Sequence, residues 1–155
     1  MPQPCNHTSV AMLVEKDGAI LLIERRKGVL GFALPAGHVD EGETYEEAGA
    51  RELQEEVGLR ATSMELIIEG RKENACRREG GSWHRWKIYR VSAEGELKRS
   101  EDETKQARWF SKEQIRDLAR RTEEYAKGKI SEEEWTQSPG LEPVMWEWFR
   151  EMKLI

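Results

Sequence analysis

One short segment holds all of the excess negative charge of this chain. Residues 38–57 contain one basic side chain, Arg51, and eight acidic ones: Asp40, Glu41, Glu43, Glu46, Glu47, Glu52, Glu55 and Glu56. The segment carries −7, and because the whole chain carries −5, the other residues together carry +2. Clustered carboxylates are typical of a site for a hard cation, or for an anion that is reached through cations. A solvated acidic helix is the alternative interpretation, and only the spacing of the acids can distinguish it from a cation site.

The 155 residues suit one domain, expected over residues 1–155, and the order of elements predicts a mixed α and β fold. Apolar, β-prone stretches at residues 8–15 and 19–25 flank the turn signal Lys16-Asp17-Gly18 and predict a hairpin. Further strands are predicted at residues 61–71, 83–93 and 106–110. Capping boxes that begin at Thr44 and Ser111 predict helices that end near residues 57 and 126. Residues 139–153 predict a terminal amphipathic helix.

Several classes of protein are excluded or disfavoured by the composition. No apolar run approaches the ~18 residues of a membrane-spanning helix, and the N-terminus lacks the pattern of a secretory signal. Cys5 and Cys76 form no CxxC pair, which argues against a disulfide scaffold and against a cysteine-based zinc site, and favours a reducing cytoplasmic location. A generic nucleic-acid binder would carry a basic stripe, so a nucleic-acid partner is also disfavoured.

The spacing of the glutamates places three of them on one helix face. At about 100° per residue, Glu52, Glu55 and Glu56 span an arc of roughly 100°. Like charges at these spacings cost only ~0.2–0.5 kcal/mol per pair, so a solvated face is still tolerable. However, Mg²⁺ typically uses one or two carboxylates together with substrate phosphates. Three glutamates on one face can therefore hold two or three such ions.

A longer pattern around these glutamates is more specific. The stretch GHVDEGETYEEAGARELQEEVGL, residues 37–59, resembles a complete Nudix box and agrees with the family pattern at every fixed position. The order of predicted elements is also similar to the Nudix fold, an α/β/α sandwich with a mixed sheet. The resemblance implies hydrolysis of a nucleoside diphosphate linked to a group X, with Mg²⁺ or Mn²⁺ as the cofactor.

The resemblance implies a role for individual residues of this chain. Glu52 is the first candidate for the general base and Glu103, on a loop, is the second; Glu101 and Asp102 are alternatives to Glu103. The implied metal ligands are the backbone carbonyl of Ala36 and the carboxylates of Glu52, Glu55, Glu56 and Glu103. The implied structural residues of the box are Gly37, Glu43, Arg51 and Gly58, with Glu43 and Arg51 expected to pair.

Candidate substrate-binding residues lie on both sides of the box. In many members a basic residue at the end of the second strand contacts phosphate, and Arg26, with Arg25 beside it, occupies that place. His38, in the box loop, is a further phosphate candidate. Trp83 is a candidate for stacking on a nucleobase, with core packing as the alternative interpretation.

The features that mark several branches of the family are absent. No proline lies between Pro35 and Pro139, whereas the ADP-ribose branch has one about fifteen residues beyond the box. Elimination leaves the small MutT-like group, which releases nucleoside monophosphate and pyrophosphate from a (deoxy)nucleoside triphosphate or a modified nucleotide. A non-catalytic Nudix-fold module and a 5′-end RNA pyrophosphohydrolase are the alternatives. Many relatives form homodimers, and the aromatic C-terminal segment offers a surface for one.

Overall fold

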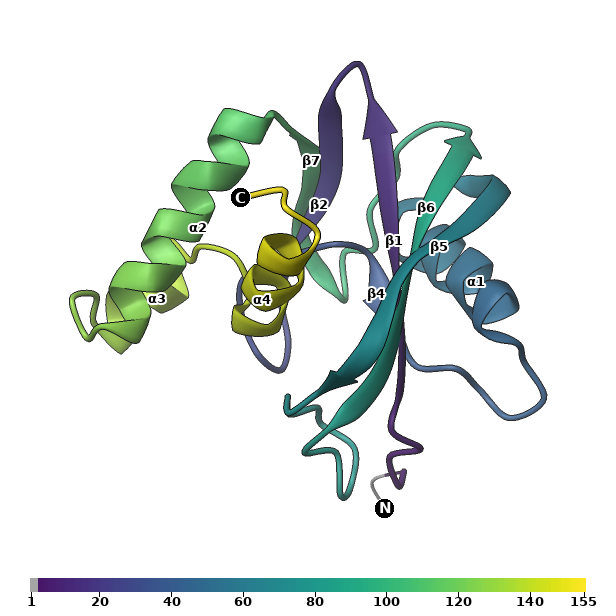
Figure 1. The fold of residues 1–155 in the computed structure, drawn as a ribbon, viewed down its shortest axis with the longest axis horizontal. Helices are drawn as coiled ribbons and strands as arrows, with labels where there is room; N and C mark the ends of the chain where they lie inside the picture. The colour runs from purple at the N-terminus through teal and green to yellow at the C-terminus, as the bar shows by residue number, and fades with distance from the viewer. Residues whose placement is uncertain (1–2) are drawn as a thin grey trace.

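A mixed β-sheet lies at the centre of the molecule, with helices on both faces (Figure 1). The computed structural model describes residues 3–155. Strand β1 pairs antiparallel with β2 and runs parallel to β6, while β5 pairs with β6 and β7 pairs with β2. The strands are β1 (Thr8–Lys16), β2 (Ala19–Arg25), β3 (Phe32–Ala33), β4 (Ala36–Gly37), β5 (Arg60–Lys72), β6 (His84–Glu94) and β7 (Thr104–Phe110).

The predicted hairpin forms between β1 and β2. Lys16 pairs with Ala19, and the two residues between them, Asp17 and Gly18, both have positive φ angles of 52° and 80°. This backbone suits a two-residue turn whose twist matches that of the flanking strands. The two-residue strands β3 and β4 were not predicted, because so short a strand leaves no periodic pattern in the sequence.

The helices begin at the predicted capping residues. Helix α1 (Tyr45–Val57) has Thr44 as its N-cap with a full capping box, and Gly58 ends it with φ 74°. Helix α2 (Lys112–Ala126) begins after Ser111 with the glutamine form of the same box. These side chains accept hydrogen bonds from backbone N–H groups that have no partner within the helix.

The C-terminal part of the chain contains one helix that was not predicted. Helix α3 (Glu132–Gln137) is short, and its buried Trp135 stacks on Tyr125 with ring centroids 4.1 Å apart. Helix α4 (Pro143–Glu151) is the predicted terminal helix, but it begins later than expected because Pro143 occupies its first turn. Among residues 3–155, no helix combines the length and the apolar character needed to span a membrane.

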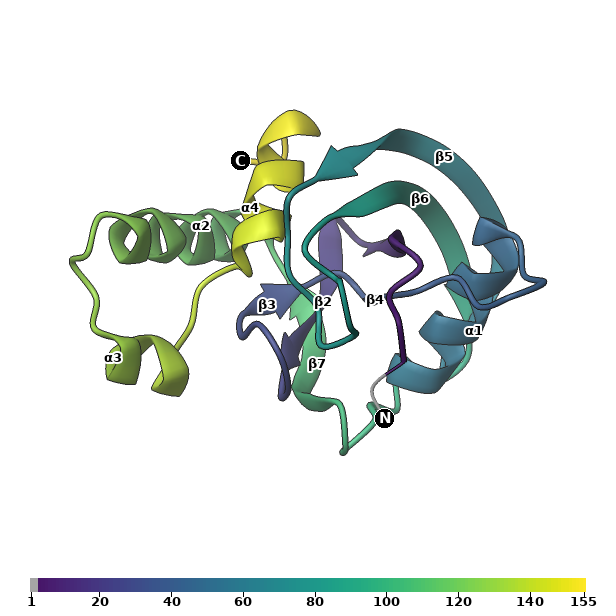
Figure 2. The same ribbon diagram turned by 90° about the horizontal axis from the view of Figure 1, so that it is seen from below.

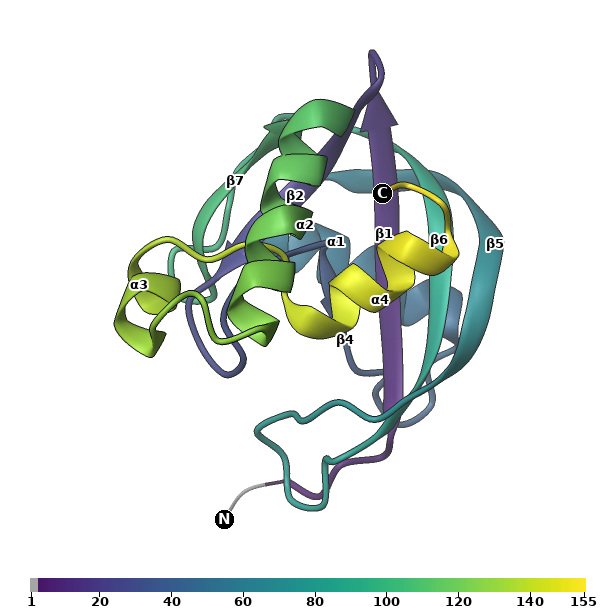
Figure 3. The same ribbon diagram turned by 60° about the vertical axis from the view of Figure 1, so that its left-hand side comes forward.

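Two apolar layers pack on opposite faces of the sheet. Leu53 and Val57 of α1 pack with one layer, and Trp148 and Phe149 of α4 pack with the other. Figure 2 shows β5 and β6 curving around β1, with α1 on one side and α4 on the other. In Figure 3, α4 crosses in front of β1 while α1 lies behind the sheet. This is the predicted α/β/α sandwich with a mixed sheet.

Helix α4 is expected to contribute strongly to stability because Phe149 is fully buried. The Phe149→Ala variant should lower the free energy of unfolding by about 3–5 kcal/mol, through lost burial and the cavity that remains. The control is Arg150→Ala, an exposed neighbour on the same helix, which should change it by less than about 0.5 kcal/mol. Urea unfolding followed by circular dichroism measures both, and equal effects would contradict this role for α4.

Candidate active site

Two adjoining clefts lie beside β4. The first, which we call the charged cleft, has a volume of about 220 Å³. The second, which we call the α4 cleft because α4 forms one wall, has a volume of about 230 Å³. Residues that line both clefts are Arg25, Ala36, Gly37, His38 and Cys76. A ligand with two chemically different ends could therefore occupy both clefts at once.

Helix α1 directs two glutamates toward the charged cleft and leaves the third outside it. Glu56 is only 5% exposed and accepts a hydrogen bond of 2.8 Å from the backbone N–H of Ala36. Glu52 lies so close to Gly37 that a Cβ on this glycine would be 2.2 Å from the Glu52 carboxyl carbon. The Glu55 side chain is 56% exposed and does not line the charged cleft. The three predicted ligands are thus not equivalent in position.

The guanidinium of Arg51 joins the loop before α1 to the helix itself. It donates two hydrogen bonds to Glu43, of 2.8 and 2.9 Å, which is the pairing expected from the sequence. It also donates to the carboxylate of Glu52 at 2.9 Å and to the carbonyl of His38 at 3.1 Å. The Arg51 hydrogen bonds lower the pKa of Glu43 to about 2. Arg51 therefore fixes the loop conformation and the position of Glu52 together.

Burial and mutual repulsion make the two inner glutamates difficult to ionise together. Burial raises the pKa of Glu52 to about 7, although Arg51 opposes the shift. Burial and the charge of Glu52 raise the pKa of Glu56 as well. Glu103 lines the same cleft, and its charge acts on both groups in the same direction. A donor set of clustered carboxylate oxygens that repel one another fits a hard divalent cation, which would stabilise their ionised forms.

The predicted substrate-binding residues separate into two groups. Arg25 and His38 line both clefts. Arg26 is exposed and lines neither cleft, although its backbone N–H donates to the carbonyl of Glu103 at 3.0 Å. Trp83 also lines neither cleft and instead stacks on the ring of His7, with centroids 3.9 Å apart. The structure thus brings Arg25, rather than Arg26, to the place expected for a phosphate contact.

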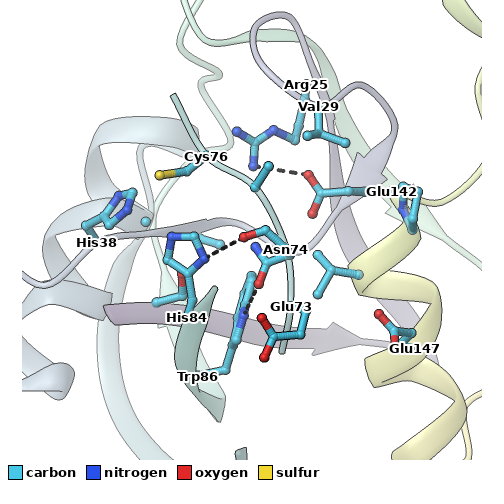
Figure 4. Close-up of a pocket in the computed structure, with 16 residues that line it drawn as sticks. Arg25, Val29, His38, Glu73, Asn74, Cys76, His84, Trp86, Glu142 and Glu147 are labelled. Atoms are coloured by element: carbon cyan, nitrogen blue, oxygen red, sulfur yellow. Dashed lines mark hydrogen bonds and ion pairs between the residues drawn. The ribbon is translucent and has the colours of Figure 1, made fainter. Parts of the chain in front are cut away.

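Sequence patterns did not reveal much of the α4 cleft. Trp86 donates a hydrogen bond of 3.0 Å from its Nε1 to the side chain of Asn74, and Arg25 lies 3.3 Å from the carboxylate of Glu142 (Figure 4). Val144 of α4 adds an apolar contact to the same cleft. No motif marks these residues, because they come from β6, from the β5–β6 loop and from the start of α4, which only the fold brings together.

The two cysteines are also neighbours in space. Their Sγ atoms lie 3.7 Å apart, and the rings of His38 and His84 adjoin Cys5. The absence of a CxxC pair from the sequence did not reveal that the two cysteines meet. Spacing along the chain does not report on side chains that arrive from separate loops.

Comparisons with known proteins show what this chain is similar to. A family model described as NUDIX domain matches residues 6–133. The crystal structure of a MutT NUDIX hydrolase from Burkholderia pseudomallei is 27% identical, with a TM-score of 0.63, and the match covers 72% of this chain and 86% of that one.

Two curated relatives are similar over shorter stretches. An ADP-ribose pyrophosphatase of Methanocaldococcus jannaschii is 51% identical over 57 residues, which are 34% of this chain and 34% of the relative. The 8-oxo-dGDP phosphatase NUDT18 of Mus musculus is 32% identical over 110 residues, which are 68% of this chain and 32% of the relative. In these matches the chain spans about a third of the length of each relative.

The raised pKa values of Glu52 and Glu56 predict that the stability of the metal-free protein falls as the pH rises. Because the folded-state pKa of Glu52 is about 7 and that of Glu56 is also raised, folding favours their protonated forms. Stability should therefore be highest below about pH 4.5 with respect to these groups, and should fall as the pH rises through about 7. The Glu56→Gln variant keeps an acceptor for the Ala36 N–H and removes one charge. With a chelator at pH 8, the Tm of this variant should lie a few degrees above the Tm of the unmodified protein.

Thermal unfolding followed by circular dichroism at pH 4.5 and pH 8 measures this effect. The difference between the two proteins should shrink at pH 4.5, where both carboxyls are largely protonated in the fold. The Glu41→Gln variant, which changes an exposed acid of the same segment, controls for net charge. A Glu56→Gln protein that is less stable at pH 8 would show that the buried carboxylate is not strained by its neighbours.

Proposed function

We propose that this chain, which belongs to the Nudix family, hydrolyses a nucleoside triphosphate or a modified nucleotide to the monophosphate and pyrophosphate, with Mg²⁺ as its cofactor. One observation carries the proposal. Acidic and basic side chains line the same small cleft: Glu52 and Glu56 come from α1, Arg25 from the end of β2, and Lys27 from the loop that follows. Such a cleft suits a chain of phosphates that reaches the acids through a bound cation.

The choice of a triphosphate follows from the charge and size of the charged cleft. Arg77 and Arg78 of the β5–β6 loop add two further cations to Arg25 and Lys27 around a volume of about 220 Å³. Several phosphate groups match these cations better than a second, uncharged sugar would. The absence of the proline that marks the ADP-ribose branch points the same way.

The α4 cleft supports a role in binding the nucleoside. Trp86 and Val144 offer apolar surface, and Asn74 offers a side chain that can hydrogen-bond to a base. Asn74 is oriented by its hydrogen bond from Trp86. Val144 lies on α4, outside the residues that the family model matches, so this wall is a place where selectivity for the base can differ from that of relatives.

The residues of the charged cleft divide the chemistry among them. A divalent cation held by Glu52, Glu56 and Glu103, with Glu55 and the carbonyl of Ala36 as the further predicted ligands, would neutralise phosphate oxygens and make water more acidic. Glu52 is proposed to accept the proton of the attacking water at a carboxylate oxygen, with Glu103 as the second candidate. The water oxygen bonds to phosphorus, and the bridging oxygen leaves with pyrophosphate. Arg25 stabilises the negative charge on that leaving group.

Two variants of α1 test the role of the carboxylates. Glu52→Gln and Glu56→Gln should each lower kcat by at least about 100-fold, because both lose a charge at the reacting centre. Glu41→Gln, on the exposed turn before α1, should keep kcat within about twofold. Steady-state kinetics at saturating Mg²⁺ give the comparison, and a Glu56→Gln protein with full activity would refute the assignment of the site.

Neighbouring arginines provide a second, matched test. Arg25→Gln should lower kcat/KM by about 10–100-fold, because it removes a charged contact to phosphate while a polar group still faces Glu142. Arg26→Gln should have little effect, since Arg26 lines neither cleft. The same kinetic assay compares them, and a larger loss for Arg26→Gln would favour the residue expected from the sequence.

The substrate class is tested by product analysis over a panel of nucleotides. The panel holds canonical, oxidised and methylated (deoxy)nucleoside triphosphates, nucleoside diphosphates, ADP-ribose and 5′-triphosphate RNA, each with and without added Mg²⁺. Release of monophosphate and pyrophosphate from a triphosphate, only with Mg²⁺, is the expected result. Preferred cleavage of ADP-ribose or of RNA would overturn the substrate class, and binding without any cleavage would identify a non-catalytic module.

A further inference from the structure

Four side chains with soft or borderline donor atoms meet beside the two clefts, and two of them, His38 and Cys76, line both clefts. Cys5 precedes β1, His38 follows β4, Cys76 lies in the β5–β6 loop, and His84 begins β6. Their donor atoms all lie within 4.8 Å of one another. Figure 4 shows Cys76, His38 and His84 close together beside Asn74. The hydrolysis as proposed above gives none of the four a step, so it does not account for their convergence. His38, which the sequence suggested as a phosphate contact, is here assigned to a metal instead.

The three donor–donor distances that involve Cys5 match those between ligands of one tetrahedral ion. Zinc lies about 2.3 Å from sulfur and about 2.0–2.1 Å from nitrogen, so tetrahedral ligands are separated by roughly 3.8 Å for two sulfurs and roughly 3.6 Å for sulfur and nitrogen. The Sγ atoms of Cys5 and Cys76 are 3.7 Å apart. Cys5 Sγ lies 3.6 Å from Nε2 of His38 and 3.4 Å from Nε2 of His84.

Contacts around the cluster orient the donor atoms. Nδ1 of His84 donates a hydrogen bond of 3.0 Å to the carbonyl of Asn74. The other ring nitrogen, Nε2, is then unprotonated in the neutral ring and directs its lone pair, which can bind a metal, toward Cys5. The backbone N–H of His7 donates to Cys5 Sγ at 3.3 Å, and the backbone N–H of Arg78 donates to Cys76 Sγ at 3.4 Å. These hydrogen bonds hold the two sulfur atoms in place beside the imidazole rings.

We propose that Cys5, His38, Cys76 and His84 bind one zinc ion as a tetrahedral Cys₂His₂ site. Four protein ligands leave no open position, so the ion is structural and takes no part in the hydrolysis. Thiolate and imidazole donors select zinc, whereas the carboxylates of α1 suit Mg²⁺, and the two sites differ in the metal that they prefer. The proposal does not depend on the substrate or on the activity proposed above.

The ion would join three segments: the N-terminal segment through Cys5, the β5–β6 loop through Cys76, and the loop between β4 and α1 through His38. Pro4 already bridges to Glu79, and the N–H of Cys5 donates to the carbonyl of Glu79 at 2.7 Å. Gly81 lets the loop close over the sulfur, because a Cβ there would lie 2.1 Å from Cys76 Sγ. The same loop carries Asn74 and Arg77 to the clefts. Zinc at this place would therefore set the shape of the two clefts through their walls, because His38 and Cys76 line both.

Metal content and cobalt spectroscopy of the full chain test the proposal. Protein purified under reducing conditions should contain about one zinc ion per chain by elemental mass spectrometry. Protein freed of metal and given one equivalent of Co²⁺ should show the intense visible bands of a tetrahedral site and a near-ultraviolet thiolate-to-cobalt transition. Cys5→Ser and Cys76→Ser should each lower zinc content at least tenfold and weaken the thiolate transition.

Two further variants distinguish this zinc site from metal bound elsewhere on the chain. His7→Asn changes the histidine outside the cluster, at a residue whose φ of 59° asparagine tolerates, and should leave zinc content and the cobalt spectrum unchanged. Glu56→Gln should also keep both, since it alters only the carboxylate site. These results would support the proposal even if the cysteine variants fold poorly.

Three outcomes would overturn the zinc site. Unmodified protein that binds no zinc when supplied with it under reducing conditions would show that the four groups only hydrogen-bond to one another. A Cys5–Cys76 disulfide in protein purified without reductant, with no metal present, would assign the cysteines to a different role. A cobalt spectrum that lacks the thiolate transition, or that is lost in Glu56→Gln, would place the metal on the carboxylates instead.

Discussion

The bond network of Arg51 is the interaction on which the rest of the charged cleft depends. One guanidinium binds Glu43 through two hydrogen bonds, and also binds Glu52 and the carbonyl of His38. The loop between β4 and α1 cannot move without breaking several of these bonds. A planar fork with fixed donors suits this task, because a lysine could not satisfy the same acceptors in the same directions.

This rigid junction allows two carboxylates to be buried against their own repulsion. Glu52 and Glu56 lie under β4, where burial raises the pKa of each carboxyl group. Such an arrangement is unfavourable without a cation and favourable with one. A divalent ion bound there, as proposed, would relieve this repulsion, so that its affinity would depend on the folded geometry. The basic side chains of the neighbouring clefts lie mainly in the charged cleft, whereas β6 and α4 give the other cleft a more apolar wall.

Signals that depend on neighbouring residues were visible in the sequence, whereas contacts between distant segments were not. The turn at Asp17 and the capping boxes at Thr44 and Ser111 depend on a few neighbouring residues, so the pattern predicted them correctly. The sequence did not show that Arg25, and not Arg26, lines the clefts, because strand periodicity cannot tell which of two adjacent arginines faces a cleft. The position of Trp83 away from both clefts likewise depends on its stacking with His7.

The sequence by itself determined the fold class, the helix that carries the glutamates and the pairing partner of Arg51. The fold class follows from the order of elements along the chain. The helix and the Arg51 pairing follow from spacing within one continuous segment, where helix geometry converts sequence distance into direction. Only the tertiary structure decided which glutamates are buried, that α4 forms a wall of the cleft, and that two cysteines meet two histidines. Those features join residues from separate loops and strands. Their proximity depends on how the sheet curves and on how the elements pack, which no local pattern records.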